Sequence, residues 1–543
     1  MQNSSCIIYV NAANNSKIQD GSSWRYAFKD LQAALDIAAK YPYSQIWVAK
    51  GTYIPTRVYS PNGVVGGLYG QNRPELATFN LPNGVSIYGG FNGTECKRCE
   101  RNLCENKTIL SGANVLWHVV IAGNDTVPRT PVYARLNDLI IREGNARGPF
   151  GSTSLEPFTY DHSSGAGIYF IYDSVLQLKN VSLSRNNAAN LGAGMLSVNA
   201  TPLIKSSSFI ANFSQSQAGG LAIYNTYNNT VVYEALVKDT LFEGNGTVNF
   251  GGGVVVEGVI PADASSVKFK GCKFTGNYAL EGGAVVVDSI TATFKCCLFV
   301  KNRSYVNGGA LATTNIVSTI IAASQQPPQI FNNKTTYIVD CQFLKNITEG
   351  NAYLRQVILG NPMMLGISFP IGGGALVSYL NGLLHVTKSQ FKSNKALNSG
   401  GGAILNGKSS GSMPLGVENL TVYAASTSVY ECEFFNNEAV NGGAIASEKD
   451  DVVFTPAIVV NPANIQLTVN KSLFVQNKAL KFGGAIYSDT SAVILGCNVY
   501  KCNKAGEAGN ALYLLNSILN DHPTELVVKD NSCYDSREDG RCY

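Results

Sequence analysis

A short phrase that recurs along the chain constrains its fold more than any other feature. In its clearest copy, residues 274–287 read FTGNYALEGGAVVV: an F-x-x-N, then Gly-Gly-Ala five residues after the asparagine, then a run of valines. Aligned on their glycine turns, eleven such units follow one another, at spacings as short as 26 or 27 residues. A period of this size indicates a solenoid, because each unit can bury its apolar face only against its neighbours.

The content of one unit indicates which solenoid it builds. VKFKGCKF (267–274) alternates polar and apolar residues as a strand does, and no unit contains a ten-residue helical pattern. The units therefore predict an all-β fold, a single-stranded right-handed parallel β-helix. Successive coils would stack about 4.8 Å apart, so that equivalent residues form columns. We expect a stack of the phenylalanines, a ladder of the asparagines and sharp corners at Gly-Gly.

A further column lies two residues before the motif phenylalanine and holds only small residues, which predicts a crowded interior. Its members are Ser207, Thr240, Cys272, Cys297, Cys341, Ser389, Cys432 and Ser472. Cα atoms one coil apart lie within disulfide range. Two interpretations stay open: Cys272–Cys297 or Cys297–Cys341 form vertical disulfides, or the thiols pack as small apolar side chains.

The N-terminal part differs from the repeats. Residues 24–41 (WRYAFKDLQAALDIAAKY) predict an amphipathic helix, followed by a strand and turn over 45–55. The helix would cap the first coil, because an open solenoid end exposes an unpaired strand edge. Its apolar stripe is Ala27, Phe28, Leu31, Ala34, Leu35 and Ala38.

We see no linker and predict one β-helix domain over 1–543. It would comprise an N-terminal strand and capping helix (1–45), irregular first coils (46–160), the repeated coils with surface insertions (161–515) and a C-terminal cap with a cysteine loop (516–543). The main insertions are expected near 316–340, 347–370, 406–430 and 447–465, where contacts with partners usually concentrate.

Composition agrees with a β-rich protein that has many turns. Of 543 residues, 54 are glycine and only 14% are charged, below the usual share of about a quarter. No run of about 20 apolar residues is available to span a bilayer. The net charge of +4 is too small to indicate binding to nucleic acid or to an anionic membrane, and we expect no membrane insertion. The start MQNSSCIIYV lacks the pattern of a signal peptide, and we expect a leader to be missing from this chain.

The 13 cysteines indicate an oxidising compartment. Two terminal groups of four could each hold two disulfides: Cys6, Cys96, Cys99 and Cys104, and Cys497, Cys502, Cys533 and Cys542. Cys96-x-x-Cys99 with Cys104 is also a partial zinc pattern, but no histidine lies close by. We therefore predict neither a metal site nor a cofactor.

Sequons for N-glycosylation are about twice as frequent as chance predicts, which indicates a secreted surface. The candidates are Asn3, Asn14, Asn92, Asn106, Asn124, Asn180, Asn199, Asn228, Asn333, Asn419 and Asn470. Four further sequons coincide with motif asparagines, at Asn212, Asn245, Asn302 and Asn346. If these four point inward, they cannot carry glycan.

No constellation of residues predicts catalysis. Polysaccharide lyases and hydrolases need paired carboxylates, or a basic residue that faces a charged sugar. Asp450-Asp451 lies in an insertion, and Asp161-His162 lies in a polar stretch before Gly165. Both are more often solvated loop residues than catalytic ones. We predict that the protein is not an enzyme and has no catalytic residues.

F-x-x-N paired with G-G-A-[ILV] resembles the repeats of the chlamydial polymorphic membrane proteins and of related pectin-lyase-like β-helix proteins. The N-terminal run, from IYVNAANN through IWVAKGTYIPT to KTILSG, is similar to the start of many secreted bacterial right-handed β-helix proteins. The resemblance covers nearly the whole chain and implies an exported, surface-displayed and often adhesive protein. Two features differ from it: Cys533 and Cys542 enclose a small loop in place of a recognisable anchor, and the sequon excess suggests a host that glycosylates.

The sequence thus predicts a non-enzymatic, N-glycosylated, secreted or cell-surface protein. Its function is expected to be that of a structural subunit of an extracellular fibre or coat, which associates with itself. A monomeric adhesin or carbohydrate-binding protein is the alternative, with exposed aromatics such as Tyr353 or Tyr423 as contacts for a glycan or a cell-surface receptor. A polysaccharide lyase or hydrolase is the weakest of the three.

Overall fold

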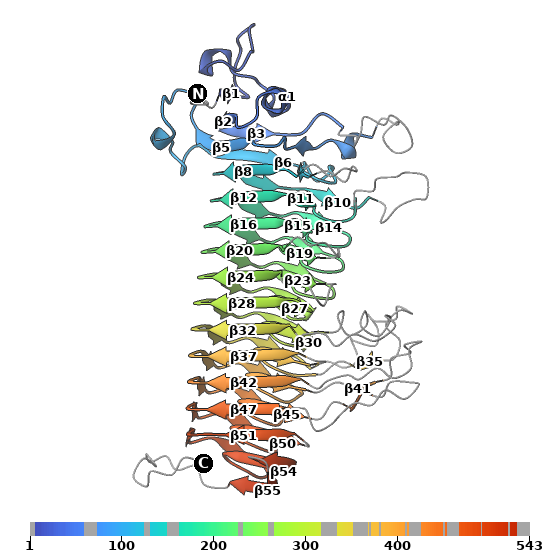
Figure 1. Cartoon of the computed structure of the whole chain (residues 1–543), viewed down its shortest axis with the longest axis vertical. Helices are drawn as coiled ribbons and strands as arrows, with labels where there is room; N and C mark the ends of the chain where they lie inside the picture. The colour runs from blue at the N-terminus through green and yellow to red at the C-terminus, as the bar shows by residue number, and fades with distance from the viewer. Residues whose placement is uncertain are drawn as a thin grey trace. The chain divides into compact units, whose positions relative to one another are not determined.

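The computed structural model (Figure 1) describes residues 6–58, 73–123, 131–148, 162–225, 232–258, 265–315, 334–350, 367–368, 371–379, 382–407, 410–411, 425–448, 451–452, 466–489, 491–519 and 522–528. Contacts divide the chain into two compact units. Unit 1 comprises Met1–Asn225 and Asn229–Val248, and unit 2 comprises Thr226–Asn228 and Asn249–Tyr543. Each unit is built almost entirely of parallel strands, as the repeats predict.

In unit 1 the strands form four rows, a to d, within which neighbouring strands pair in parallel. Row a contains β1 (Ile7–Val10), β2 (Gln45–Ala49), β5 (Ser86–Phe91), β8 (Tyr133–Asn137), β12 (Val175–Lys179), β16 (Thr201–Lys205) and β20 (Glu234–Lys238). Row b contains β4 (Phe79–Asn80), β7 (Val120–Ala122), β11 (Ile168–Ile171), β15 (Met195–Val198) and β19 (Leu221–Asn225). Row c contains β3 (Gly51–Tyr53), β6 (Thr108–Ser111), β9 (Ile140–Arg142), β13 (Ser182–Ser184), β17 (Ser208–Ile210) and β21 (Leu241–Glu243). Row d contains β10 (Asn145–Ala146), β14 (Asn187–Ala188), β18 (Phe213–Ser214) and β22 (Gly246–Thr247).

Unit 2 has the same four rows. Row a contains β24 (Ser266–Lys270), β28 (Thr291–Lys295), β32 (Thr335–Val339), β37 (Leu383–Thr387), β42 (Ser426–Tyr430), β47 (Gln466–Asn470) and β51 (Ala492–Leu495). Row b contains β23 (Val254–Gly258), β27 (Val285–Asp288), β31 (Leu311–Thr314), β36 (Leu376–Ser378), β40 (Ile404–Asn406), β45 (Ile445–Glu448), β50 (Ile486–Asp489) and β54 (Leu512–Leu519). Row c contains β25 (Lys273–Thr275), β29 (Leu298–Val300), β33 (Gln342–Leu344), β38 (Gln390–Lys392), β43 (Glu433–Phe435), β48 (Leu473–Val475) and β52 (Val499–Lys501). Row d contains β26 (Tyr278–Glu281), β30 (Arg303–Asn307), β34 (Ile347–Thr348), β39 (Lys395–Ala396), β44 (Glu438–Ala439), β49 (Lys478–Ala479) and β53 (Lys504–Ala505).

From β8 onward, each coil passes through rows a, c, d and b in that order, and one sequence unit supplies one coil (Figure 1). Strands of successive coils pair in register. Val267–Lys270 of β24, for example, lie opposite Ala292–Lys295 of β28. Because the side-chain period of a strand is two, this register keeps each apolar column inside and each polar column outside. The fold is therefore the parallel β-helix that the sequence predicts.

The corners explain the Gly-Gly pair. In the unit that starts at Gly282, this first glycine has a φ of +58°, a left-handed conformation that side chains disfavour. A Cβ on the next residue, Gly283, would lie 2.3 Å from the carbonyl oxygen of Gly309 in the following coil. The first glycine therefore permits the turn and the second permits the close approach of two backbones.

The N-terminal helix is shorter than the sequence predicts. The α-helix α1 spans Leu31–Lys40, whereas Trp24–Tyr26 form the separate 3₁₀ turn η1. The Asp30 side chain accepts a hydrogen bond from the Gln32 N–H and starts α1 there, because an Asp N-cap satisfies a free donor of the first turn. Phe28 instead bridges to Val10 of β1. The predicted stripe residues Ala27, Leu31, Ala34, Leu35 and Ala38 are all buried, and α1 contacts β1, β2 and β4.

Smaller elements complete the described chain. Two further 3₁₀ turns, η4 (Pro74–Leu76) and η5 (Arg98–Glu100), lie in unit 1. In unit 2, β35 (Ile367–Ser368), β41 (Ser410–Gly411) and β46 (Asp451–Val452) form a small separate sheet, and β55 (His522–Val528) pairs antiparallel with β54. Most of the predicted insertions, with Tyr353 and Tyr423, lie outside the described residues.

Candidate functional site: two surface hollows on unit 1

The motif asparagines form two buried ladders, one in each unit. In unit 1, Asn186 donates its side-chain amide to Oδ1 of Asn212 at 2.9 Å, and Asn212 donates to Asn245 at 2.9 Å. In unit 2, equivalent steps of 2.9–3.0 Å join Asn277, Asn302, Asn346, Asn394, Asn437, Asn477 and Asn503. The predicted ladder is thus confirmed. Its side chains are saturated by their own neighbours and buried, so the four sequons on motif asparagines point inward.

The motif phenylalanines form the predicted aromatic stack. In unit 1, the rings of Phe209 and Phe242 stack with centroids 4.9 Å apart. In unit 2, centroid distances of 4.6–4.9 Å connect Phe274, Phe299, Phe343, Phe391, Phe434 and Phe474. These rings are fully buried, so they stabilise the coils and offer no surface to a ligand.

The column of small residues is buried, as predicted, and it repeats one hydrogen bond. Each side chain donates to the carbonyl oxygen two residues before it: Ser207 to Lys205 at 2.9 Å, Cys297 to Lys295 at 3.4 Å and Ser389 to Thr387 at 2.8 Å. Cys272, Cys297, Cys341 and Cys432 carry free thiols in this structure. Contacts with the Cys272 and Cys341 thiols, together with burial, raise the pKa of Cys297, and burial raises the pKa of Cys432 to about 12.

The terminal cysteines differ from one another. Cys6, Cys96, Cys99 and Cys104 are exposed free thiols, whereas Cys497 and Cys502 are disulfide-bonded. Cys533 and Cys542 lie outside the described residues. Among the residues that the structure describes, no group of three or more His, Cys, Asp or Glu side chains is placed to hold a metal ion.

Sequons occupy both exposed and buried positions. Asn92 and Asn180 are exposed, and Asn14 and Asn470 are half-buried. Asn106 and Asn199 are buried, so a glycan on either would displace packed neighbours. The remaining candidates, Asn3, Asn124, Asn228, Asn333 and Asn419, lie outside the described residues.

Two carboxyl groups, of half-buried Glu257 and buried Asp288, meet on row b of unit 2, where the sequence shows no acidic pair. Glu257 of β23 lies opposite Asp288 of β27 in the strand register. Burial, and then the Asp288 carboxyl, raise the pKa of Glu257 to about 8. Asp288 accepts a hydrogen bond from the Ser289 hydroxyl at 2.7 Å. In the sequence the two residues belong to different repeats, and only the alignment of consecutive repeats brings them together.

Two histidines also meet, in unit 1. His162 Nδ1 lies 3.4 Å from His118 Nε2, and His118 Nδ1 lies 3.2 Å from the Gly165 carbonyl oxygen. Burial, His118 and Arg73 lower the pKa of His162 to about 3, so this imidazole is neutral at physiological pH. Asp161 lies outside the described residues. His162 is itself packed against Trp117, with ring centroids 4.6 Å apart, which is an interior environment.

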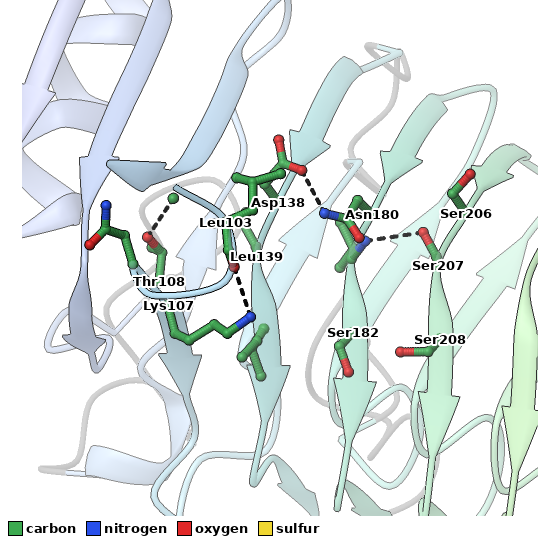
Figure 2. A pocket seen from close by; sticks show the side chains of 14 residues that line it. Leu103, Lys107, Thr108, Asp138, Leu139, Asn180, Ser182, Ser206, Ser207 and Ser208 are labelled. Carbon is green, nitrogen blue, oxygen red and sulfur yellow. Dashed lines mark hydrogen bonds between the residues drawn. The ribbon is translucent and has the colours of Figure 1, made fainter. Parts of the chain in front are cut away.

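The larger hollow on unit 1 is a groove of about 440 Å³, here called the serine groove (Figure 2). It follows the turns that lead from row a into row c, and its lining comprises Gly90, Leu103, Asn106–Thr108, Asp138–Ile140, Asn180–Ser182 and Ser206–Ser208. Its charged groups are already engaged. Lys107 Nζ donates to the Leu103 carbonyl oxygen at 2.7 Å, and Asp138 pairs with Arg101 at 2.7 Å. Asn180 donates to Asp138 at 2.7 Å, so the groove offers mainly serine hydroxyls.

The second hollow, of about 300 Å³, is here called the tyrosine hollow. It lies on the outer face of row a, where Gln45 of β2, Ser86 of β5, Arg135 of β8 and Gln177 of β12 occupy one column in register. The tyrosines in its lining are Tyr43, Tyr88 and Tyr133.

Two of these tyrosines present open ring faces. Tyr43 is 69% exposed and Tyr133 54%, whereas the Arg98 guanidinium covers the Tyr88 ring at 4.4 Å. An aromatic face beside amide and hydroxyl groups suits a sugar ring, which is apolar on its faces and polar at its edges. Sequence reasoning missed this hollow, because most of its residues come from the part of the chain before the regular repeat. The alternation of polar and apolar residues within each strand predicts that these side chains point outward, but only the pairing register of the strands brings them together.

Comparison with known proteins agrees with the repeat. Residues 471–489 match the Chlamydia polymorphic membrane protein repeat. This segment contains β48, the ladder residue Asn477, β49 and β50. No curated protein matches the chain. In the described residues, no helix is both long and apolar enough to cross a membrane. The chain is therefore a parallel β-helix with repeats like those of the Chlamydia polymorphic membrane proteins.

Proposed function

We propose that the protein is a non-enzymatic, surface-displayed adhesin that binds glycans through the outer face of its first coils. The tyrosine hollow carries this proposal. It combines two open tyrosine faces with a column of amide, hydroxyl and guanidinium groups, and its lining contains no carboxylate. The match to the repeat of the Chlamydia polymorphic membrane proteins supports display at a cell surface.

A non-enzymatic role is supported by the state of the acidic and basic groups. Glu257 and Asp288 face each other within the row-b strands, and Tyr379 donates its hydroxyl to Glu281 in the interior. His162 is packed against Trp117, and His118 against Tyr169. In the described residues, neither hollow has a pair of carboxylates in its lining. Cleavage of a polysaccharide by exhaustively purified protein would overturn this part of the proposal.

Binding to a glycan array tests the adhesin proposal. The intact chain should bind glycans, and Tyr133→Ala should weaken that binding about tenfold because it removes one stacking face. Tyr278→Ala is the matched control, since Tyr278 is also partly exposed but lies on β26 of unit 2. If the parent protein binds no glycan, or if both variants weaken binding equally, the proposal fails.

A structural subunit of an extracellular fibre or coat is the second candidate. The saturated asparagine ladders and phenylalanine stacks favour it, because they make each unit a stiff body with few charges. Self-association would then use the outer faces of the coils or the insertions. Electron microscopy of the native, unreduced protein separates the two candidates: regular filaments or sheets would support the subunit, and isolated particles the adhesin. Exposed sequons such as Asn92 would add glycan to either form.

A further inference from the structure

The outer face of row a carries a column of lysines. In unit 1, Lys179 of β12 lies opposite Lys205 of β16, which lies opposite Lys238 of β20. In unit 2, Lys270 of β24 lies opposite Lys295 of β28. In the sequence, each of these five lysines lies four residues before the motif phenylalanine, or before the leucine that replaces it, in five consecutive repeats. We call these lysines, three in unit 1 and two in unit 2, the lysine column of their unit.

This arrangement is unfavourable without a partner. Strands of successive coils lie about 4.8 Å apart, and like charges directly opposite each other destabilise a sheet. The Debye length at physiological salt is about 8 Å, so neighbouring ammonium groups are not fully screened from one another. The spacing thus sets equal charges at regular intervals along the axis of each unit.

The described residues offer little compensation. Lys179, Lys205, Lys270 and Lys295 are exposed, and none of them forms an ion pair within the described part of the chain. Lys238 lies 3.8 Å from Asp239, a distance at which an exposed pair contributes little. The ammonium groups are therefore available to an external anion.

We propose that the lysine column of each unit binds a linear sulfated polysaccharide whose chain runs along the axis of that unit. This inference rests on the proposed glycan binding and names a second ligand class on a different surface. Lysine acts as a point charge, which suits a repeated sulfate better than the two-pronged recognition of a carboxylate that arginine provides. The polysaccharide would present sulfate charges and hydroxyl groups in turn. The lysines match the charges, and the polar groups beside them match the hydroxyls.

The neighbouring residues favour a sugar chain over a nucleic acid. Asn180 and Ser206 directly follow the first two lysines and are exposed. The amide nitrogen of Asn180 donates to Asp138, so this residue offers its side-chain oxygen to sugar hydroxyls, and Ser206 offers its hydroxyl group. The adjacent outward column consists of Gln177, Leu203 and Leu236 in unit 1. None of these three is aromatic, whereas proteins that bind single strands stack bases on aromatic rings.

Dextran sulfate is the probe for the test, with unsubstituted dextran, polygalacturonate and a mixed-sequence single-stranded DNA as comparisons. Fluorescence anisotropy of the labelled polymers with the full chain gives Kd at about 50 mM and about 200 mM salt. We expect dextran sulfate to bind most tightly, with affinity that falls as salt rises, because binding releases counterions.

A matched pair of variants locates the site. Replacement of the five column lysines by Gln should weaken dextran sulfate binding at least about tenfold. The control replaces five other exposed lysines by Gln, which gives the same change in net charge, and should keep the affinity within about twofold. The control positions are Lys17, Lys345, Lys392, Lys478 and Lys481. Lys205→Gln alone should leave the melting temperature unchanged or raise it, which would show that removal of a column lysine weakens binding without unfolding the protein.

Three results would overturn the inference: equal losses in the column and control variants, tighter binding of polygalacturonate than of dextran sulfate, or tighter binding of the DNA. Binding of neutral glycans on the array without binding of dextran sulfate would sink this inference and leave the proposed adhesin standing. Absence of binding to both neutral glycans and dextran sulfate would contradict both this inference and the proposed adhesin.

Discussion

Asn302 donates its side-chain amide both to Oδ1 of Asn346 at 3.0 Å and to the Phe274 carbonyl oxygen at 3.0 Å. Its own Oδ1 accepts from the backbone and the side chain of Asn277, each at 3.0 Å. One buried amide therefore joins three successive coils. Every hydrogen-bonding group of this side chain has a partner. Its removal therefore leaves buried donors and an acceptor without partners, and each unsatisfied group costs about 1–3 kcal/mol.

We expect Asn302→Ala to lower the free energy of unfolding by about 3 kcal/mol or more. Urea titration followed by circular dichroism measures the change. Asn398→Ala is the control: Asn398 is exposed and makes one side-chain bond, at 2.8 Å to the Glu349 carbonyl oxygen, so its loss should matter little. Equal effects of the two substitutions would contradict a ladder that holds the coils together.

Phe299 is a position where loss of the aromatic ring should strongly lower stability. Its ring stacks on Phe274 and on Phe343 with centroid distances of 4.6 Å each. Phe299→Ala should destabilise unit 2 by about 3–5 kcal/mol, since it leaves a cavity between two rings. Phe299→Leu keeps most of the volume and should cost less than about 1.5 kcal/mol. Similar losses for both variants in chemical denaturation would argue against a packing role for the ring.

Cys297 is expected to behave as a buried thiol and to tolerate serine. The column already contains both serine and cysteine, and both donate to the carbonyl oxygen two residues before, as Ser389 and Cys297 do. Cys297→Ser should therefore change stability by less than about 1 kcal/mol, and Cys297→Val, which lacks the donor, by more. Thiol titration of native and unfolded protein checks the redox state. A melting temperature that falls on addition of reductant, and no longer does so in Cys297→Ser, would show a disulfide instead.

The Glu257–Asp288 pair predicts a specific pH dependence. The pKa of Glu257 is about 8 in the folded chain, above its ordinary value near 4.5. Below pH about 4.5 the carboxyl is neutral in both states, and its contribution to stability is fully present. As pH rises toward about 8, the unfolded chain loses this proton first, so the free energy of unfolding falls.

Glu257→Gln should flatten this decline, because its amide does not titrate. Thermal unfolding across pH 5 to 8, at roughly constant ionic strength, measures the slope. Glu243→Gln serves as the control, since Glu243 is exposed on β21. A slope that persists unchanged in Glu257→Gln would place the titrating group elsewhere.

The repeat made the interior predictable, and the reasons are physical. A motif that recurs in phase is stacked on itself by the register, so Phe274 and Asn302 could be placed in columns from spacing alone. The start of α1 was not predictable from its apolar stripe, because the Asp30 cap competes with the helical pattern upstream of it. The tyrosine hollow was equally hidden, since Tyr43 and Tyr133 come from coils without a fixed period. The lysine column, in contrast, could have been read from the sequence, since its residues keep a constant phase relative to the motif.

Because Oδ1 of each ladder asparagine accepts from one neighbour while its amide donates to the other, a coil presents the same pair of complementary faces whichever coil it replaces. Duplication or deletion of whole units therefore leaves no donor unmatched, whereas loss of part of a unit does. Recombination between units can change the number of coils without any compensating substitution in the interior. The number of coils is thus free to vary among descendants of such a gene, while the motif within each coil is not.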